Sequence, residues 1–426
     1  MSLQARGSLP DPAHHWHVLW YFQERSFENQ FSSVNATRTA EIAALNQFDV
    51  PARATGASLK LEHELTETLT AHWGFDGKWQ YGQTREQFRN LGAGFTRERH
   101  AGGEQWFTGV FAGINWQPQS DEVWNVFAEV RGNAWQNVNG IRHEFNLANG
   151  SLLRHERFNS PVFLHGDIRT GIAYRPVSEW KWTVAGYTGH RVPTLNELYR
   201  PFRVRNDIVE ANPDLQKEFL YGGEVSVEWE PRPELTFGLQ GYYQIVENPV
   251  VNTFLANGPG VNPIAGFIPA GGTGSQRRNL GESEQMGLEF DVRIQPHTTL
   301  TWEAAYTLSR SAFTSSSPTL YSGNQLPQSP NHRLRLRNTW QPINALQLVL
   351  EGRYDSAQYE DALNSRRLDD SFTLAASIQW QINDHIDILI FGENLLDEEI
   401  EAGIASNGLV TVGTPLTVGS SLTVHF

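Results

Sequence analysis

The sequence of 426 residues has no cysteine, only two methionines and no long apolar run. Without Cys, the chain can form no disulfide, thiolate metal site or Cys nucleophile. No apolar run approaches the ~20 residues that a membrane-spanning helix needs, which excludes a helical membrane protein. The formal net charge of −14 argues against a nucleic-acid binder, which usually has a basic face.

The first 12 residues lack the apolar core and the small-residue cleavage pattern of a secretory signal. We therefore expect either a cytosolic protein or a chain that is not the complete precursor. We expect residues 1–12 to be irregular and the rest of residues 1–426 to form one domain. Disorder is a poor fit, because aromatic residues make up 12% of the chain and charged residues only 19%.

An alternation of apolar and polar residues with period two runs through almost the whole chain. In residues 371–382 the even positions are Phe372, Leu374, Ala376, Ile378, Trp380 and Ile382, and small or polar residues stand between them. Residues 416–426 repeat this alternation. Successive side chains of a strand point to opposite faces, so each segment should be a strand with one apolar and one polar face.

The connections between these segments alternate strictly between short and long. The short ones fall at 64–68, 117–122, 175–179, 230–234, 295–298, 341–345 and 382–385. The long ones fall at 35–52, 84–103, 139–161, 190–216, 248–280, 312–331, 361–370 and 395–415. This pattern predicts about 16 strands, the first of them near residues 16–34.

Two all-β folds compete for this pattern. A soluble sandwich or propeller would bury its apolar faces, and its turns would not sort into short and long in strict order. An antiparallel transmembrane β-barrel turns its apolar faces to lipid, with short turns on one side and long loops on the other. The strands are long, and Trp residues near their ends are typical of an interfacial girdle. We therefore predict a barrel in the bacterial outer membrane, placed there by the barrel-assembly machinery.

Basic residues alternate along one predicted strand at Arg333, Arg335 and Arg337. Such a row would be costly in a dry core unless it were paired. We expect it to face the lumen and to pair with Glu303, Glu351 and Asp355 on adjacent strands. Guidance of an anionic substrate is the alternative role.

Two motifs make the sequence resemble the barrel of the TonB-dependent outer-membrane receptors. The first is Gly-His-Arg-Val-Pro-Thr-Leu-Asn-Glu-Leu-Tyr at 189–199, followed by Asn-Pro-Asp-Leu-Gln-Lys-Glu at 212–218. The second is Glu-Asn-Leu-Leu-Asp at 393–397, followed by a last strand that ends in an aromatic residue. Lys217 stands where the family usually has Pro, and Leu396 where it usually has Phe.

The resemblance implies a receptor for uptake of a bulky, scarce nutrient such as a ferric siderophore or cobalamin, energised by TonB. It also implies a plug domain and a 22-stranded barrel. We recognise no plug in this sequence, so we interpret the chain as a C-terminal portion of such a barrel, with TonB acting through an N-terminal segment outside it. If its first and last strands had to pair, we expect a poor or open seam. The alternative function is a passive 16-stranded porin.

The motif residues are expected to be architectural. Pro193 can open a short helical turn, because its missing N–H is not needed there, and Glu197 and Tyr199 would dock this turn on the barrel rim. The full set is Arg191, Pro193, Glu197, Leu198, Tyr199, Asn212, Pro213, Glu218, Asn394, Leu395, Asp397 and Phe426.

Ligand contacts are expected from aromatic and basic residues of the long loops. The candidates are Arg203, Arg205, Phe254, Phe267, Arg277, Arg278 and Tyr321. Packing of these loops on each other is the alternative role for the same residues. No motif of a hydrolase, zinc protease or phosphate-binding loop occurs, so we predict no enzyme, no cofactor and no metal site.

Overall fold

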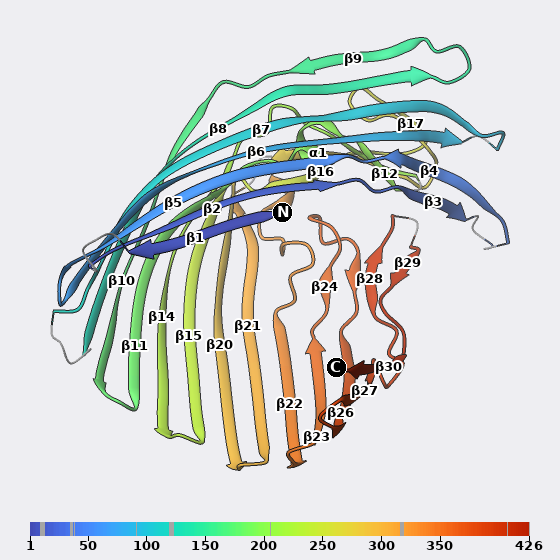
Figure 1. Ribbon diagram of the computed structural model, residues 1–426. Coiled ribbons are helices and arrows are strands. Elements are labelled where there is room, and N and C mark those ends of the chain that lie inside the picture. Colours follow the sequence, from blue (N-terminus) through green and yellow to red (C-terminus); the bar gives the residue numbers. More distant parts are fainter. Residues whose placement is uncertain are drawn as a thin grey trace.

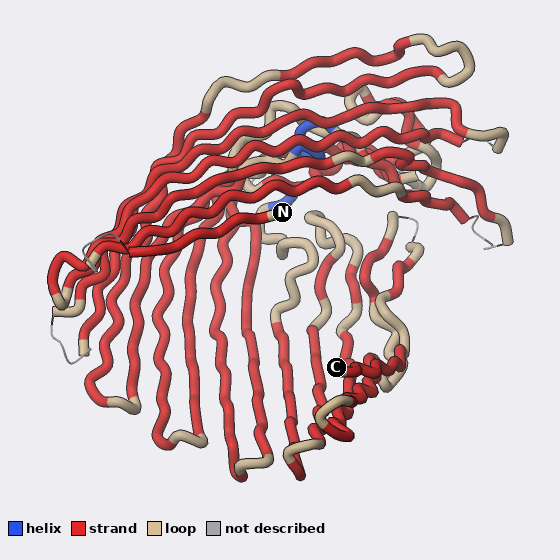
Figure 2. The backbone as a smooth tube through the Cα atoms, viewed as in Figure 1, coloured by secondary structure: helices blue, strands red, loops and turns tan. Residues whose placement is uncertain are grey.

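The computed structural model describes residues 1–8, 13–34, 37, 39–90, 92–118, 123–204, 206–315, 319–406 and 408–425. One antiparallel sheet of 20 strands dominates this part of the chain and curves around a hollow (Figure 1). Figure 2 shows that helix is almost absent and lies on the concave side of the sheet. The predicted antiparallel barrel fold is confirmed. None of the described helices is both long and apolar enough to span a membrane.

The strands of the curved wall pair in chain order, each antiparallel to the next. Their hydrogen-bonded order is β1 (Ser2–Ser8), β2 (His14–Arg25), β5 (Ala52–Thr66), β6 (Leu69–Asn90), β7 (Phe95–Trp116), β8 (Trp124–Asn146), β10 (Phe163–Val177), β11 (Trp180–Arg191), β14 (Glu218–Arg232), β15 (Leu235–Glu247), β20 (Glu282–His297), β21 (Leu300–Ser315), β22 (His332–Ile343), β23 (Leu346–Asp355), β26 (Ser371–Asn383), β27 (Ile386–Glu393) and β30 (Thr417–Val424).

The remaining elements belong to the long connections. Three of them extend the wall: β3 (Asn29–Val34), β4 (Glu41–Asp49) and β9 (Leu152–Phe158). Four others form a small sheet in the order β12 (Phe202–Val204), β13 (Asp207–Glu210), β19 (Thr273–Asn279) and β16 (Val250–Asn257). The rest are the pairs β17 (Gly260–Asn262) with β18 (Gly266–Ile268), β24 (Gln358–Tyr359) with β25 (Arg367–Leu368) and β28 (Glu401–Ile404) with β29 (Val410–Val412), the helix α1 (Leu195–Tyr199) and a 3₁₀ turn (Thr319–Tyr321).

Setting β1, β3, β4 and β9 aside leaves 16 of the 20 described strands of the main sheet, the number that the alternation predicts. The expectation that residues 1–12 are irregular is wrong for Ser2–Ser8, which pair with β2 and thereby cover its edge. Residues 9–12 lie outside the described part of the chain. The region 84–103 is also less loop-like than expected, because β6 and β7 stay paired as far as Asn90 and Phe95.

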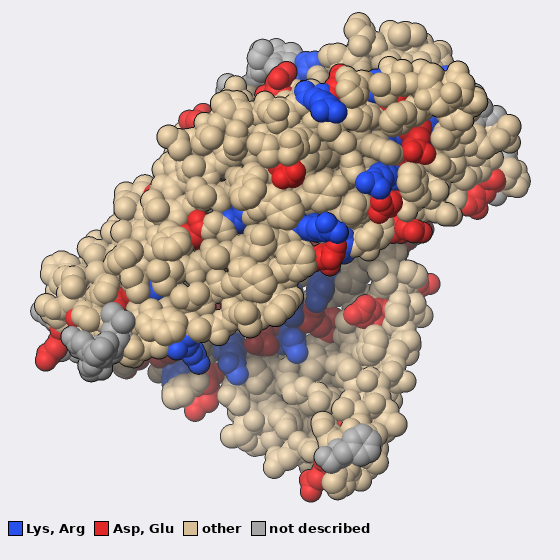
Figure 3. All heavy atoms as spheres, turned by 45° about the horizontal axis from the view of Figure 1, so that its top comes forward, with Lys and Arg blue, Asp and Glu red and all other residues tan. Residues whose placement is uncertain are grey.

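The two faces of the wall differ as a lipid-facing barrel requires. Phe75 and Val110 are cross-strand partners on the outer face, and 52% and 64% of their surface is exposed. Leu288 and Leu308 form a similar exposed pair on β20 and β21. Figure 3 shows acidic and basic side chains gathered in the hollow, and others on the upper part of the wall. Apolar groups outside and charges inside are the arrangement of a membrane barrel.

The wall is open between its first and last strands. β1 pairs with β2, and β30 pairs with β27. No ladder joins β1 to β30 in the described residues. The two edges are separate in Figure 1.

Apolar packing is concentrated among the long connections instead of within the wall. One cluster joins Leu280, Phe313, Tyr321 and Ala362. A second joins Leu198, Tyr199 and Leu215. A one-layer wall has no dry interior of its own, so the buried side chains gather where the loops fold over it.

Candidate functional site

The 189–199 motif forms a capped helical turn at the rim of the wall. Thr194 caps α1, and its hydroxyl accepts a hydrogen bond from the backbone N–H of Glu197. The Glu197 carboxylate accepts in return from the Thr194 backbone, which completes a capping box. Arg191 donates to Glu197 at 3.0 Å and to Glu218 at 2.6 Å. One guanidinium therefore ties α1 to both β11 and β14.

Tyr199 anchors the other end of this turn. Its side chain is buried, stacks on Phe158 with ring centroids 5.3 Å apart, and lies against Gly140. Burial raises the pKa of Tyr199 to about 12. Pro193 is also fully buried, and its carbonyl accepts a hydrogen bond from Gln105 at 2.8 Å.

A buried ion cluster lies beside α1 and was not predicted from the sequence. Glu86 of β6 has no exposed side-chain surface and binds Arg99 at 2.5 Å and Arg200 at 2.7 Å. Arg99 also reaches Glu144 at 3.3 Å. Burial acts to raise the pKa of Glu86, but the charges of Arg99 and Arg200 outweigh it and hold that pKa below 4.5. The register of β6, β7 and β8 brings Glu86, Arg99 and Glu144 together, and Arg200 reaches Glu86 from the end of α1.

Side chains in the other motif segments, 212–218 and 393–397, hydrogen-bond to backbone groups of the loops. The amide of Asn212 donates to the carbonyl of Arg277, and that of Asn394 donates to the carbonyls of Glu398 and Thr414. Asp397 accepts from the backbone N–H of Leu416. Leu395 is 36% exposed. Pro213 lies in the turn after Asn212, and Phe426 lies outside the described residues.

The predicted ligand residues separate into two groups. Arg277 and Tyr321 are engaged within the loops. Arg277 donates to the carbonyls of Asn196 and Arg200, and Tyr321 is 1% exposed with its hydroxyl accepting from the Phe254 backbone N–H. Both therefore make contacts of the loop-packing kind that was the alternative role.

The other group lies nearer the surface. The Phe254 and Phe267 side chains are 37% and 59% exposed on β16 and β18. Arg278 of β19 donates to Gln276. Arg203 lies on β12, where burial and the charge of Arg89 lower its pKa. Arg205 lies outside the described residues.

The arginine row of β22 is paired as predicted. Arg333 lies 3.1 Å from Asp355, and Arg335 lies 2.7 Å from Glu351. Arg337 is 4.0 Å from Glu303. The row therefore meets acidic partners on both neighbouring strands.

Comparison with known proteins assigns the family. The family model of the TonB dependent receptor-like β-barrel matches residues 5–395. The chain belongs to this family of outer-membrane receptors. No curated protein matches the sequence.

Solved structures share the fold at low identity. The ferric yersiniabactin uptake receptor of Yersinia pestis matches with a TM-score of 0.75 and 15% identity, over 100% of this chain and 60% of the receptor. A copper transporter matches with a TM-score of 0.74 and 13% identity, over 100% of this chain and 65% of the transporter. The ferric-catecholate import receptor of Escherichia coli K12, in its closed form, matches with a TM-score of 0.71 and 13% identity, over 100% of this chain and 63% of the receptor. The chain thus spans 60–65% of the length of these structures.

Proposed function

We propose that this chain forms the wall of an outer-membrane receptor that takes up a bulky, scarce nutrient. The nutrient is of the ferric siderophore or cobalamin type. The observation that carries the proposal is the family match over residues 5–395. Uptake would be energised by TonB acting on a plug segment outside residues 1–426.

The long connections supply a suitable ligand surface. Phe254 and Phe267 present aromatic faces on two small strands, and Arg278 lies on the strand paired with Phe254. Aromatic faces and guanidinium groups together suit a large, anionic chelate. We assign Arg277 and Tyr321 to support of this surface, because the loops already engage them.

A passive porin is the weaker alternative. Diffusion through an open pore does not need the capped turn that Arg191, Glu197 and Glu218 build at the rim. The family match also favours a receptor.

Uptake by cells that express the complete gene tests the proposal. Ferric siderophores of the catecholate, hydroxamate and phenolate classes and cobalamin are offered one at a time, in cells with and without TonB. We expect accumulation of one of them that depends on TonB. Uptake of small solutes that is independent of TonB and falls with solute size would instead identify a porin.

A further inference from the structure

A cluster of four side chains lies where two wall strands separate. β10 and β11 are paired from their shared turn up to Arg169 and Tyr187. Beyond that point residues 163–168 pair with β8, and residues 188–191 pair with β14. The backbone N–H of Ile168 donates to the Thr188 hydroxyl instead of to a strand partner. His165 and Asp167 of β10 and His190 of β11 fill this gap.

Three metal-ligand groups converge in the gap. His165 Nε2 lies 2.9 Å from Asp167 Oδ1, and His190 Nδ1 lies 2.9 Å from Asp167 Oδ2. One ligand atom from each residue can be chosen so that all lie within 4.8 Å of one another. Four-coordinate Zn²⁺ with bonds near 2.1 Å needs its ligand atoms about 3.4 Å apart. Small side-chain shifts would therefore admit such an ion.

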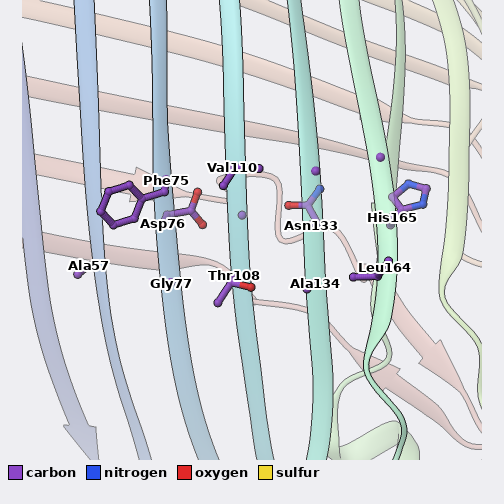
Figure 4. Close-up of a pocket in the computed structure, with 13 residues that line it drawn as sticks. Ala57, Phe75, Asp76, Gly77, Thr108, Val110, Asn133, Ala134, Leu164 and His165 are labelled. Atoms are coloured by element: carbon purple, nitrogen blue, oxygen red, sulfur yellow. The ribbon is translucent and has the colours of Figure 1, made fainter.

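The cluster is enclosed but can be reached. The three side chains are 10%, 15% and 17% exposed in chain order. His190 lines a cavity of about 320 Å³ together with Asp76, Arg131 and Asn133. Figure 4 shows His165 on β10, next to the strand of Asn133, with Asp76 two strands further along the wall. Arg131, which lines the same cavity as His190, is bound to Asp76 at 2.7 Å.

Lys217 is the fourth member of the cluster. Its ammonium group contacts His165 Nδ1. An ammonium can only donate, so this nitrogen accepts and the ring proton is on Nε2, facing Asp167. Lys217 stands at the position where the related motif has proline, which has no such amine. The contact with His165 is therefore a departure of this chain from the motif.

We propose that His165, Asp167 and His190 bind a divalent transition metal ion of the Zn²⁺ type, and that Lys217 competes with this ion. Imidazole and carboxylate form a common donor set for such ions, and three protein ligands leave a position for water. Binding at Nε2 of His165 moves the ring proton to Nδ1, where Lys217 can no longer donate. The His190 proton likewise moves from Nδ1 to Nε2, so no net proton is released by the neutral rings. A bound ion would cross-link β10 and β11 where their ladder ends.

Metal titration of the purified chain in detergent tests this proposal. The probes are Zn²⁺ in competition with a chromophoric chelator, and Co²⁺, whose visible absorption reports low coordination number. We expect one tight equivalent of metal. His165→Gln and His190→Gln should each weaken it by on the order of 100-fold, whereas Lys217→Met should tighten it by about tenfold.

The control variant is His155→Gln. His155 lies on β9, where its ring stacks on that of His143 with centroids 4.4 Å apart. This variant should still bind one tight equivalent of metal. If a His variant does not fold, Asp167→Asn tests the same metal site, because it keeps the shape of the side chain. The absence of a tight equivalent overturns the proposal and leaves a hydrogen-bonded cluster. Binding that survives in His190→Gln, or that weakens in Lys217→Met, overturns it as well.

Discussion

Arg191 of β11 and Glu218 of β14 are direct cross-strand partners, and their charged atoms lie 2.6 Å apart. The same guanidinium also holds Glu197 of α1. Glu218 in turn accepts from the backbone N–H of Val250, at the start of β16. Two residues of the motif thus connect the wall, the helical turn and the small loop sheet.

Replacement of this arginine should loosen the rim locally. For Arg191→Ala we expect a loss of about 1 kcal/mol, because the guanidinium is 43% exposed and solvent weakens its charged hydrogen bonds. Amide hydrogen exchange at 195–216 should rise. Arg333→Ala, which breaks a pair whose side chains are 60% and 47% exposed, should have a smaller effect. Equal effects of the two variants would contradict the role given to Arg191.

Because Tyr199 packs closely against the wall, replacement of Gly140 by a residue with a Cβ should destabilise the fold. A Cβ on Gly140 would lie 2.5 Å from the Tyr199 ring, and that ring is buried against Phe158. We expect Gly140→Ala to cost about 1–3 kcal/mol through overpacking. On the same strand, a Cβ on Gly132 would meet its nearest neighbour at 3.6 Å, so Gly132→Ala should be close to neutral. Denaturant unfolding in detergent, followed by tryptophan fluorescence, compares the two variants.

The buried ion cluster of Glu86, Arg99 and Arg200 should be among the most sensitive sites of β6 and β7. Glu86→Gln leaves Arg99 and Arg200 with a neutral partner whose side chain has no exposed surface. Breaking one member of a buried ion pair typically costs about 3–5 kcal/mol. We expect a loss of that size, measured by hydrogen exchange of β6 and β7. Wild-type exchange in Glu86→Gln would show that the cluster does not hold these strands.

Acidic pH should reproduce part of the stability loss expected for Glu86→Gln. The pKa of Glu86 is lowered in the fold, so its charge stabilises the native state fully above its ordinary value of 4.5. This contribution is lost as the pH falls through the folded value. The stability difference between wild type and Glu86→Gln should therefore be constant near neutral pH and shrink below 4.5. If the stability difference between the two proteins instead grows on acidification, the pKa of Glu86 is raised and not lowered in the fold.

The wall could be predicted from the sequence because its signal is local. Alternation such as that of residues 371–382 requires only that one face meets lipid and the other the lumen. The pairing of the arginine row of β22 is predictable for the same reason, since the short turn at 341–345 sets which residues of β23 lie opposite. The short turns are equally predictable from the sequence.

The rim was only partly predictable. The motif indicated a helical turn at Pro193, but the buried contacts of Glu86 depend on the register between β6 and β7 and on a residue 114 positions away. The His165 and His190 cluster depends on the point where two strands separate, which leaves no pattern in the sequence. Ser2–Ser8 lacks a clear apolar alternation, and its strand forms because β2 offers a free edge.

The orientation of the wall supports every functional statement above, and thiol labelling of intact cells tests it most directly. The chain has no Cys, so single cysteines can be placed at Gly260, where an added Cβ meets nothing within 4 Å, and at the exposed Asn344. Gly260 lies in a long connection, and Asn344 lies in the turn between β22 and β23. A membrane-impermeant reagent should label Gly260→Cys in intact cells and Asn344→Cys only after the outer membrane is permeabilised. Labelling of Asn344→Cys but not Gly260→Cys in intact cells would contradict a receptor whose long loops meet the ligand outside.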